Sequence, residues 1–393
     1  MDNRATRSNR SSGRCASACS PTPSWRSSRT RSSRSLLALL LLCAFGTSAQ
    51  TTPQESLTAV ATRDRKIVKR FALAGDPRGL AVGSDGTIYA GLAEPQAVVA
   101  VDPKTGAVKK RLVLDSPDIA STKELVTMRT SADGKRLFIA NGSDESATIL
   151  SLPDLAVLRE ITMEGETIRD ILPDPKGRYV YLLGRRVHVF DKEGDTELRT
   201  LDIEDPMAIA ASANGSLLAV VATEDFGNTK ATVAALFDPN NNFAEVARDP
   251  LQTDKTIEAA IFAARDRSLI AFSRDALFEK PIAARATRMT GTNGGAMRAE
   301  LGDLVNSNHV CLPQGSGPQI ATLATTDTML VYAERRCSAS GSFSGSSRGV
   351  TPASLYGVNA YAIAFDKLTN TLVATDREGF LTIYNLPRPA TAR

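Results

Sequence analysis

Histidine, tryptophan and cysteine are scarce in this chain of 393 residues. It contains two histidines and one tryptophan, and the tryptophan, Trp25, lies close to the N-terminus. The scarcity of imidazole argues against a zinc or haem site built from several histidines. His188 alternates with apolar residues in a predicted strand, which favours packing at a surface or between sheets over metal binding. His309 lies in a predicted loop, where we expect exposure to solvent rather than a catalytic role.

Apolar runs long enough to cross a membrane are also absent. The run at residues 36–46 has eleven residues, whereas a membrane-spanning helix needs about 20. It follows an Arg/Ser-rich stretch and precedes the small residues Thr47, Ser48 and Ala49. This order predicts that residues 1–49 are a signal peptide. We therefore expect a periplasmic, cell-surface or secreted protein with no membrane span after cleavage.

The net charge of +4 comes from this N-terminal region. The first 35 residues hold eight Arg and one Asp, which leaves 39 basic and 42 acidic residues in the rest of the chain. A nearly balanced chain gives no electrostatic argument for nucleic-acid binding. We therefore expect no nucleic-acid partner.

Two cysteines, Cys311 and Cys337, remain once the leader is removed. In an exported protein such a pair favours one disulfide bond. Two separate buried thiols are the alternative.

A repeating unit begins at Asp76. An apolar strand there runs into the pair Asp85-Gly86, and a second apolar strand follows. Asp-Gly favours a two-residue type I′ hairpin turn, in which both turn residues take positive φ. Two more strands follow around a Pro/Gly turn at residues 102–106, giving four short antiparallel strands in about 45 residues.

Further copies continue this rhythm along the chain. Their turns or strand pairs lie at Asp133-Gly134, 174–177, Asn214-Gly215, 258–272, 318–333 and 359–375. Seven units over the 344 residues after the leader average about 49 residues each, in the range of four-stranded propeller blades. The predicted fold class is all-β, a single β-propeller of seven four-stranded blades. Six or eight blades stay open as alternatives, because units five and six are irregular.

The two ends of the chain each have one strand without a partner, residues 66–73 and 380–384. Pairing them would close the ring and leave no exposed edge. The predicted parts are a lead-in at 50–65, the propeller at 66–386 with an insertion at 274–310 and a flexible Ser/Gly-rich loop at 338–350, and a tail at 387–393. Within the insertion, residues 296–305 are predicted to form a short helix.

The units resemble a known family of repeats. The features that match are the Gly-x-Pro start at 75–77, the Asp-Gly hairpin, the Tyr89-Ala90 strand and the Val-Asp-Pro-x-Thr-Gly turn at 101–106. They are similar to YVTN-type propeller repeats over residues 67–240 and 359–386. Such repeats occur in bacterial surface-layer and exported proteins and in relatives of lactonase-type propellers.

The resemblance implies a propeller fold and, for the lactonase relatives, hydrolysis of a sugar lactone. No catalytic set of that family can be placed on residues of this sequence. Because no tryptophan follows the leader, propellers with Trp-Asp repeats and those with tryptophan docking motifs and a quinone cofactor are set aside.

Aligned units place polar residues near the start of the innermost strands, around one mouth of the central channel. The candidate ligands for a hard cation such as Ca²⁺ are Asp76, Glu124, Asp205, Glu258 and Asn359. About two positions further on, the candidates for ligand binding are Arg78, Arg169, Gln319 and Tyr361, of which the arginines suit an anion. The alternative is that these side chains only solvate the channel mouth or cap turns. No other cofactor is expected.

The function we expect is that of an exported, monomeric binding or scaffold module for a protein, peptide or glycan. The alternative is a lactonase or another metal-assisted hydrolase at the channel mouth, with Asp205 and Glu258 as essential carboxylates. A self-associating surface-layer protein is a third interpretation. The insertion and the irregular units five and six are expected to form the specialised face.

Overall fold

The computed structural model divides into two compact units, Met1–Thr51 and Thr52–Arg393, and every described residue belongs to the second. The described residues are 58–59, 67–73, 75–93, 96–114, 127–141, 145–227, 229–251, 253, 256–263, 266–273, 277–287, 296–301, 305–307, 319–325, 329–335, 351–355, 360–366, 368–369, 371–376 and 378–385. Between residues 283 and 361 only the backbone of the strands is described. In these ranges no helix could cross a membrane. The predicted signal peptide lies outside them.

Four sheets of four antiparallel strands follow one another along the chain. They are β3–β6 (Pro77–Val82, Ile88–Ala93, Gln96–Val101, Val108–Val113), β7–β10 (Thr127–Thr130, Arg136–Ala140, Ser146–Ser151, Val157–Thr162), β11–β14 (Asp170–Pro173, Tyr179–Leu183, Val187–Asp191, Glu197–Leu201) and β15–β18 (Pro206–Ala211, Leu218–Asp225, Lys230–Asp238, Ala244–Pro250).

Three further sheets complete the described strands. One contains β19 (Ala259–Ala263), β20 (Ser268–Phe272), β21 (Leu277–Thr287) and β22 (Ala296–Leu301), with β23 (Val305–Ser307) also paired to β21. Another contains β24 (Gln319–Thr325), β25 (Met329–Arg335) and β26 (Thr351–Leu355). The last combines β1 (Thr58–Ala59) and β2 (Ile67–Ala72) with β27 (Ala360–Asp366), β28 (Thr371–Asp376) and β29 (Phe380–Asn385).

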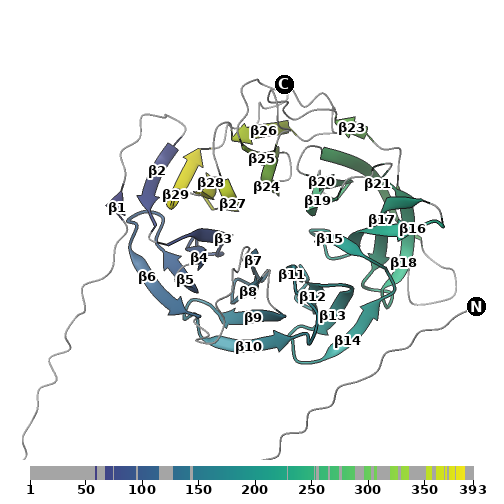
Figure 1. Cartoon of the computed structure of the whole chain (residues 1–393), viewed down its shortest axis with the longest axis horizontal. Helices are drawn as coiled ribbons and strands as arrows, with labels where there is room; N and C mark the ends of the chain where they lie inside the picture. Colours follow the sequence, from purple (N-terminus) through teal and green to yellow (C-terminus); the bar gives the residue numbers. More distant parts are fainter. Residues whose placement is uncertain are drawn as a thin grey trace, which may run out of the picture. The chain divides into compact units, whose positions relative to one another are not determined.

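The sheets of Thr52–Arg393 are arranged around a common axis (Figure 1). The first strand of each repeat lies innermost. The predicted all-β propeller is therefore confirmed. The β24–β26 sheet departs from the expected blade, because it has three described strands and its β25–β26 pair is parallel. A ring of seven blades, each with four strands, thus stays a prediction.

The two ends of the propeller are joined by one strand pair. β2 pairs antiparallel with β29, which confirms the predicted closure of the ring. Arg70 of β2 reinforces the pair, because its guanidinium lies 3.3 Å from the carboxylates of Asp376 and Glu378 and 3.8 Å from the ring centroid of Phe380. Packing, backbone hydrogen bonds and ion pairs therefore all act at the closure.

The hairpin turns of the units share one geometry, which differs from the predicted type I′ turn. At each turn a glycine N–H donates to the carbonyl three residues earlier, at Gly86, Gly134, Gly177 and Gly215. In the turn between β3 and β4, Gly86 has positive φ, at 81°, whereas Asp85 does not. Asp85 Oδ1 instead accepts the N–H of Thr87 at 2.9 Å. The turn is therefore a three-residue loop that ends in a left-handed glycine, because the aspartate prefers this side-chain bond.

The core lies between the faces of neighbouring sheets. Because side chains alternate along a strand, each sheet presents apolar residues to both neighbours. In β4, Tyr89 packs with Leu137 and Leu150 of the following sheet, whereas Ile88 packs in the cluster that contains Val373 of β28. All five side chains are at most 1% exposed. Burial of each stabilises the fold by roughly 1.5–3 kcal/mol, so the ring depends on contact between sheets.

The predicted helix over residues 296–305 is wrong. The segment forms β22, whose residues pair with the second half of β21, and β23 begins at Val305. β21 has eleven residues, and only its first five pair with β20. Its free length offers backbone donors and acceptors, which outweigh the local helical preference of the segment.

We predict that shortening a buried side chain of β2, the strand that closes the ring, destabilises the whole propeller. Phe71 of β2 is 2% exposed and packs with Val101 and Leu381, so Phe71→Ala should lower the free energy of unfolding by about 3–5 kcal/mol. Val68→Ala in the same strand is the matched control, since Val68 is 45% exposed and should cost no more than about 0.5 kcal/mol. Urea unfolding followed by fluorescence measures both. Equal losses would show that closure does not limit stability.

Candidate functional site

Four predicted channel-mouth residues lie directly before the innermost strand of their sheets. They are Asp76 before β3, Arg169 before β11, Asp205 before β15 and Glu258 before β19. Two of these positions make the same backbone bond, because the N–H of Ala93 donates to Asp76 at 2.7 Å and that of Thr223 to Asp205 at 3.1 Å. The structure therefore places Asp76 and Asp205 at equivalent positions in their sheets.

Asp76 and Arg78 neutralise each other. The Arg78 Nε lies 2.7 Å from Asp76 Oδ2, and its Nη2 lies 2.5 Å from the same oxygen. Both side chains are partly buried. The pair lowers the charge that either residue can offer to a cation or an anion at the channel mouth.

Arg169 joins two neighbouring sheets. Its alignment with Arg78 is wrong by about two positions, because β11 begins at the following residue. The guanidinium donates to the backbone carbonyl of Gly184, in the turn between β12 and β13, and to that of Pro206, the first residue of β15. Partial burial lowers the pKa of Arg169, while the carboxylates of Asp205 and Glu166 act in the opposite direction. The geometry supports a positioning role for Arg169 at the start of β15.

The other predicted site residues are not tested by the described structure. Residues outside the description are Glu124, Asn359, Cys311, Cys337 and His309, and only the backbone is described for Gln319 and Tyr361. Among the described residues, no group of three His, Cys, Asp or Glu side chains could hold a metal ion. The calcium site and the disulfide bond stay predictions.

His188 forms a polar cluster that repeat alignment does not reveal. The side chain is buried, with Nδ1 2.8 Å from Glu197 Oε1 and Nε2 3.2 Å from Glu166 Oε2. Glu166 lies in the loop between β10 and β11, and it also accepts the backbone N–H groups of Arg185 and Arg186. The cluster fastens this loop to the β11–β14 sheet through hydrogen bonds, whereas the sequence predicted packing of His188 at a surface or between sheets.

The carboxylates of this cluster are held in their ionised form. Burial alone would raise the pKa of Glu166, but the N–H of Arg186, His188 and the N–H of Arg185 together hold it below its usual value. Burial likewise acts against ionisation of Glu197, and bonds from Thr200 and His188 lower its pKa overall. The two carboxylates lie on opposite edges of the imidazole, so they do not converge on one metal ion.

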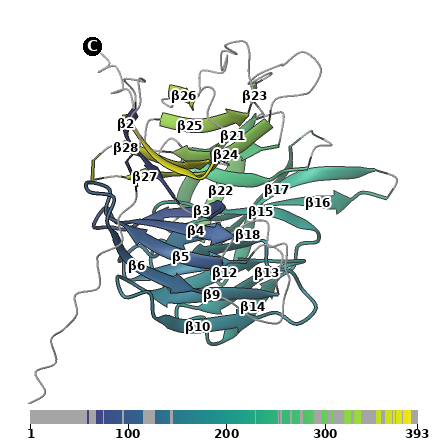
Figure 2. The same ribbon diagram turned by 60° about the vertical axis from the view of Figure 1, so that its left-hand side comes forward.

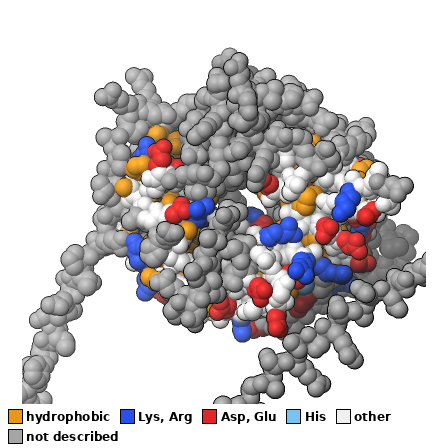
Figure 3. Space-filling view, viewed as in Figure 1, with side chains coloured by type: hydrophobic (Ala, Val, Ile, Leu, Met, Phe, Trp, Pro, Cys, Tyr) orange, Lys and Arg blue, Asp and Glu red, His pale blue; other side chains and the backbone are white. Residues whose placement is uncertain are grey.

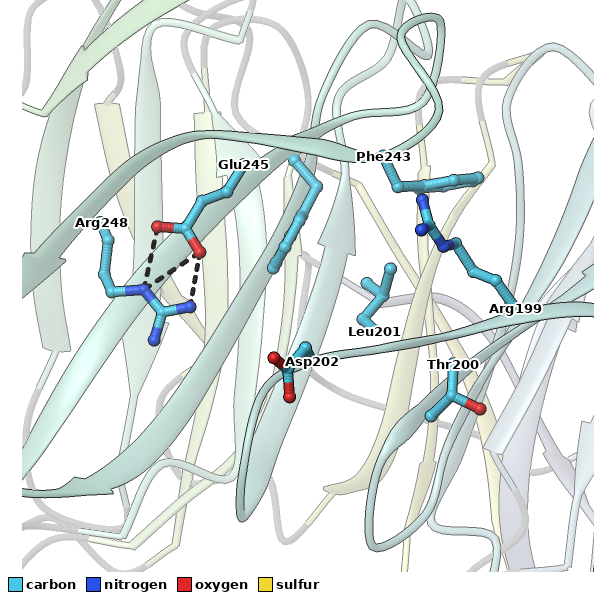
Figure 4. A pocket seen from close by; sticks show the side chains of 8 residues that line it. Arg199, Thr200, Leu201, Asp202, Phe243, Glu245 and Arg248 are labelled. Carbon is cyan, nitrogen blue, oxygen red and sulfur yellow. Dashed lines mark hydrogen bonds and ion pairs between the residues drawn. The ribbon is translucent and has the colours of Figure 1, made fainter.

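A groove of about 310 Å³ lies at the side of the propeller, between the β11–β14 and β15–β18 sheets. We call it the side groove, and it is lined by Arg199, Thr200, Leu201, Asp202, Phe237, Phe243, Glu245 and Arg248 (Figure 4). Its floor is apolar, since Leu201, Phe237 and Phe243 are 3%, 4% and 8% exposed. Its rim is charged, so the groove combines an apolar surface with polar groups at its edge.

The cations of the rim already have partners. Arg248 Nε lies 3.0 Å and 3.1 Å from the two carboxylate oxygens of Glu245, and its Nη1 pairs with Glu224 of β16. Arg199 Nη1 donates to the backbone carbonyl of Asn242. Burial raises the pKa of Glu245. The rim therefore has two arginines and two carboxylates, whose formal charges balance.

An acidic segment leads from the side groove to the start of β15. It comprises Asp202, Ile203, Glu204 and Asp205; the three carboxylate residues are exposed, and Ile203 is buried. Figure 3 shows acidic and basic side chains close together over the β15–β18 sheet. Ile203 holds this segment in place while its carboxylates face solvent.

The β16–β17 hairpin extends beyond the neighbouring hairpins (Figure 2). Its strands have eight and nine residues, whereas β12 and β13 have five each. Phe226, at its tip, is 59% exposed. The Glu224–Arg248 ion pair connects the hairpin to the side groove, so a molecule in the groove would lie near this extension.

The side groove is missed by sequence reasoning because its residues come from outer strands, whereas repeat alignment directs attention to the innermost ones. The available signal was local: Glu245 and Arg248 lie three apart, after two phenylalanines that flank a polar turn.

Together, the sheets and the strand pair that closes them define a β-propeller protein. No known protein family and no curated protein matches the sequence. The fold is similar to the β-propeller domain of Cps50 (Swd1) from Myceliophteria thermophila, with a TM-score of 0.55 and 12% identity. The match covers 85% of this chain and 100% of that domain.

A weaker likeness is to hydrazine synthase from Kuenenia stuttgartiensis, with a TM-score of 0.43 and 16% identity. It covers 52% of this chain and 64% of that one, and it supports no conclusion about function. At these identities the likeness to solved structures shows the fold alone. Membership of the YVTN-type repeats stays a prediction.

We predict that the Glu166 cluster stabilises the fold in a pH-dependent way. A carboxylate with a lowered pKa in the folded protein stabilises it above the unfolded pKa, and this contribution disappears as pH falls through the folded value. Glu166→Gln should therefore lower the melting temperature most near neutral pH, and the difference should shrink below the ordinary glutamate value of 4.5. Thermal melts from pH 3 to 8 measure it, with exposed Glu160→Gln as the control. A difference independent of pH would contradict the expected ionisation.

Proposed function

We propose that this chain is an exported, monomeric binding module that holds a protein or peptide partner in the side groove. The observation that supports this best is the combination of an apolar floor with a charged rim in one groove. Surfaces that bind partners combine buried apolar contacts with polar groups that fix orientation. The long β16–β17 hairpin adds a second contact surface beside the groove.

A peptide suits this groove better than a glycan. Phe237 and Phe243 are almost fully buried, so their rings form a floor rather than an exposed platform on which a sugar could stack. Backbone amides of a peptide can pair with the charged rim. Export rests on the predicted leader at residues 1–49.

The alternative, a lactonase or another metal-assisted hydrolase at the channel mouth, has weaker support. It needs free carboxylates, but Asp76 is paired with Arg78, and Asp205 lies beside the Arg169 guanidinium. Both cations compete with a divalent ion for these oxygens. A binding function requires no such group at the channel.

We predict that a partner can be cross-linked from the side groove but not from a distant edge. A photo-reactive phenylalanine analogue would replace Asp202, whose side chain is exposed at the rim. The matched control replaces Glu160, an exposed acidic residue on β10 in another sheet. We expect one dominant cross-linked species from position 202, detected by mass spectrometry after irradiation in living cells. Equal patterns from both positions would contradict a partner site in the groove.

A further inference from the structure

His188 lies between two carboxylates that can only accept hydrogen bonds. Its Nδ1 is 2.8 Å from Glu197 Oε1, and its Nε2 is 3.3 Å and 3.2 Å from the two carboxylate oxygens of Glu166. Burial raises the pKa of both glutamates, but the hydrogen bonds that they accept lower it below the usual value, so both are ionised at neutral pH. An ionised carboxylate has no proton to donate. The two bonds together therefore require an imidazole that is protonated on both nitrogens.

Histidine is the residue in this cluster whose ordinary charge change falls between pH 5 and 8. The other charged side chains on the elements around it are Glu145, Arg159, Glu164, Arg185, Arg186 and Asp195. All of them are exposed, and Arg159 pairs with Asp195. Carboxylates and guanidinium groups ordinarily keep their charge throughout this range. A change of charge in the cluster near neutral pH therefore occurs on the imidazole.

Loss of one proton affects the two edges of the imidazole unequally. The contact between Nδ1 and Glu197 is the shorter one, and Thr200 Oγ1 also donates to Glu197, at 2.7 Å. The neutral ring therefore keeps its proton on Nδ1, and the lone pair of Nε2 then faces the Glu166 carboxylate. This contact becomes repulsive. Glu166 then keeps the backbone N–H groups of Arg185 and Arg186 as donors.

Glu166 also connects the imidazole with the start of β11. Burial lowers the pKa of Arg169, and the carboxylates of Asp205 and Glu166 act to raise it, so both lie close enough to affect the guanidinium. Arg169 in turn donates to the backbone carbonyls of Gly184 and Pro206. Displacement of Glu166 therefore changes the charge around a residue that is bonded to the first residue of β15.

We propose that His188 is a pH-sensitive switch for the loop between β10 and β11. As an imidazolium it bonds both glutamates and holds the loop against the β11–β14 sheet. As a neutral imidazole it releases Glu166, and the loop loosens beside Arg169. This inference is independent of the side groove and of any partner that binds there.

The first test follows the imidazole in the full chain by ¹⁵N NMR from pH 5 to 9. Because the chain has two histidines, a His309→Gln variant assigns both sets of signals. We expect both nitrogens of His188 to carry protons at the acidic end of the range and Nδ1 alone at the basic end. A ring that keeps one charge state over the whole range would overturn the proposal.

The second test measures hydrogen exchange of backbone amides at both ends of this range, relative to the intrinsic rate at each pH. The amides of Arg185 and Arg186 should lose about tenfold in protection as His188 loses its proton, because their acceptor is released. The matched control is the amide of Thr87, which donates to the carboxylate of Asp85 at 2.9 Å. No change at the two arginine amides, or an equal change at Thr87, would contradict a switch at His188.

Two variants separate the switch from a purely structural role. His188→Gln is neutral at every pH and can donate from only one end, so the amides of Arg185 and Arg186 should be weakly protected from pH 5 to 9. Arg159→Gln removes a cation from an exposed ion pair of the facing sheet and should leave the pH dependence intact. A pH dependence that survives in His188→Gln would overturn the proposal. If this variant does not fold, exchange in the unsubstituted chain decides.

Discussion

Apolar contact between neighbouring sheets is the interaction on which the rest of this propeller depends. A four-stranded sheet with two apolar faces is unstable alone, and it becomes stable when both faces are covered. Tyr89 and Ile88 are consecutive in β4, and they pack toward opposite neighbours. Each sheet therefore helps to bury the next, and the last must return to the first, which is the role of the β2–β29 pair.

The polar groups join the sheets at places where apolar packing ends. Arg169 spans two sheets through backbone carbonyls, and His188 with its two glutamates fastens a connecting loop. These buried or partly buried groups hold the sheets and the loop in position, and their hydrogen bonds and ion pairs are made within the protein. The side groove differs in one residue, because Asp202 at its rim is exposed.

The periodic features of the fold could be predicted from the sequence, whereas the turn type, the structure of residues 296–305 and the side groove could not. Alternation and recurring Asp-Gly or Asn-Gly turns predicted the strands, their order and the closing pair. The turn type was wrong because the Asp85 side chain bonds to Thr87, a local choice that dipeptide statistics do not contain. The helix over 296–305 was wrong because β21 supplies a long free edge. The side groove depends on which outer strands become neighbours, and only the three-dimensional fold decides that.

The closing pair also imposes an order on synthesis. Arg70 and Asp376 are separated by 306 positions. Because the chain is made from its N-terminus onward, β2 is exposed long before its partner β29 has been synthesised. Until then β2 has no β29 beside it, and its backbone edge is free to pair with a foreign strand. If synthesis stops before residue 380, β29 is missing, and both β2 and β28 have an unpaired edge. The feature that removes edges from the finished molecule makes each unfinished one prone to aggregation.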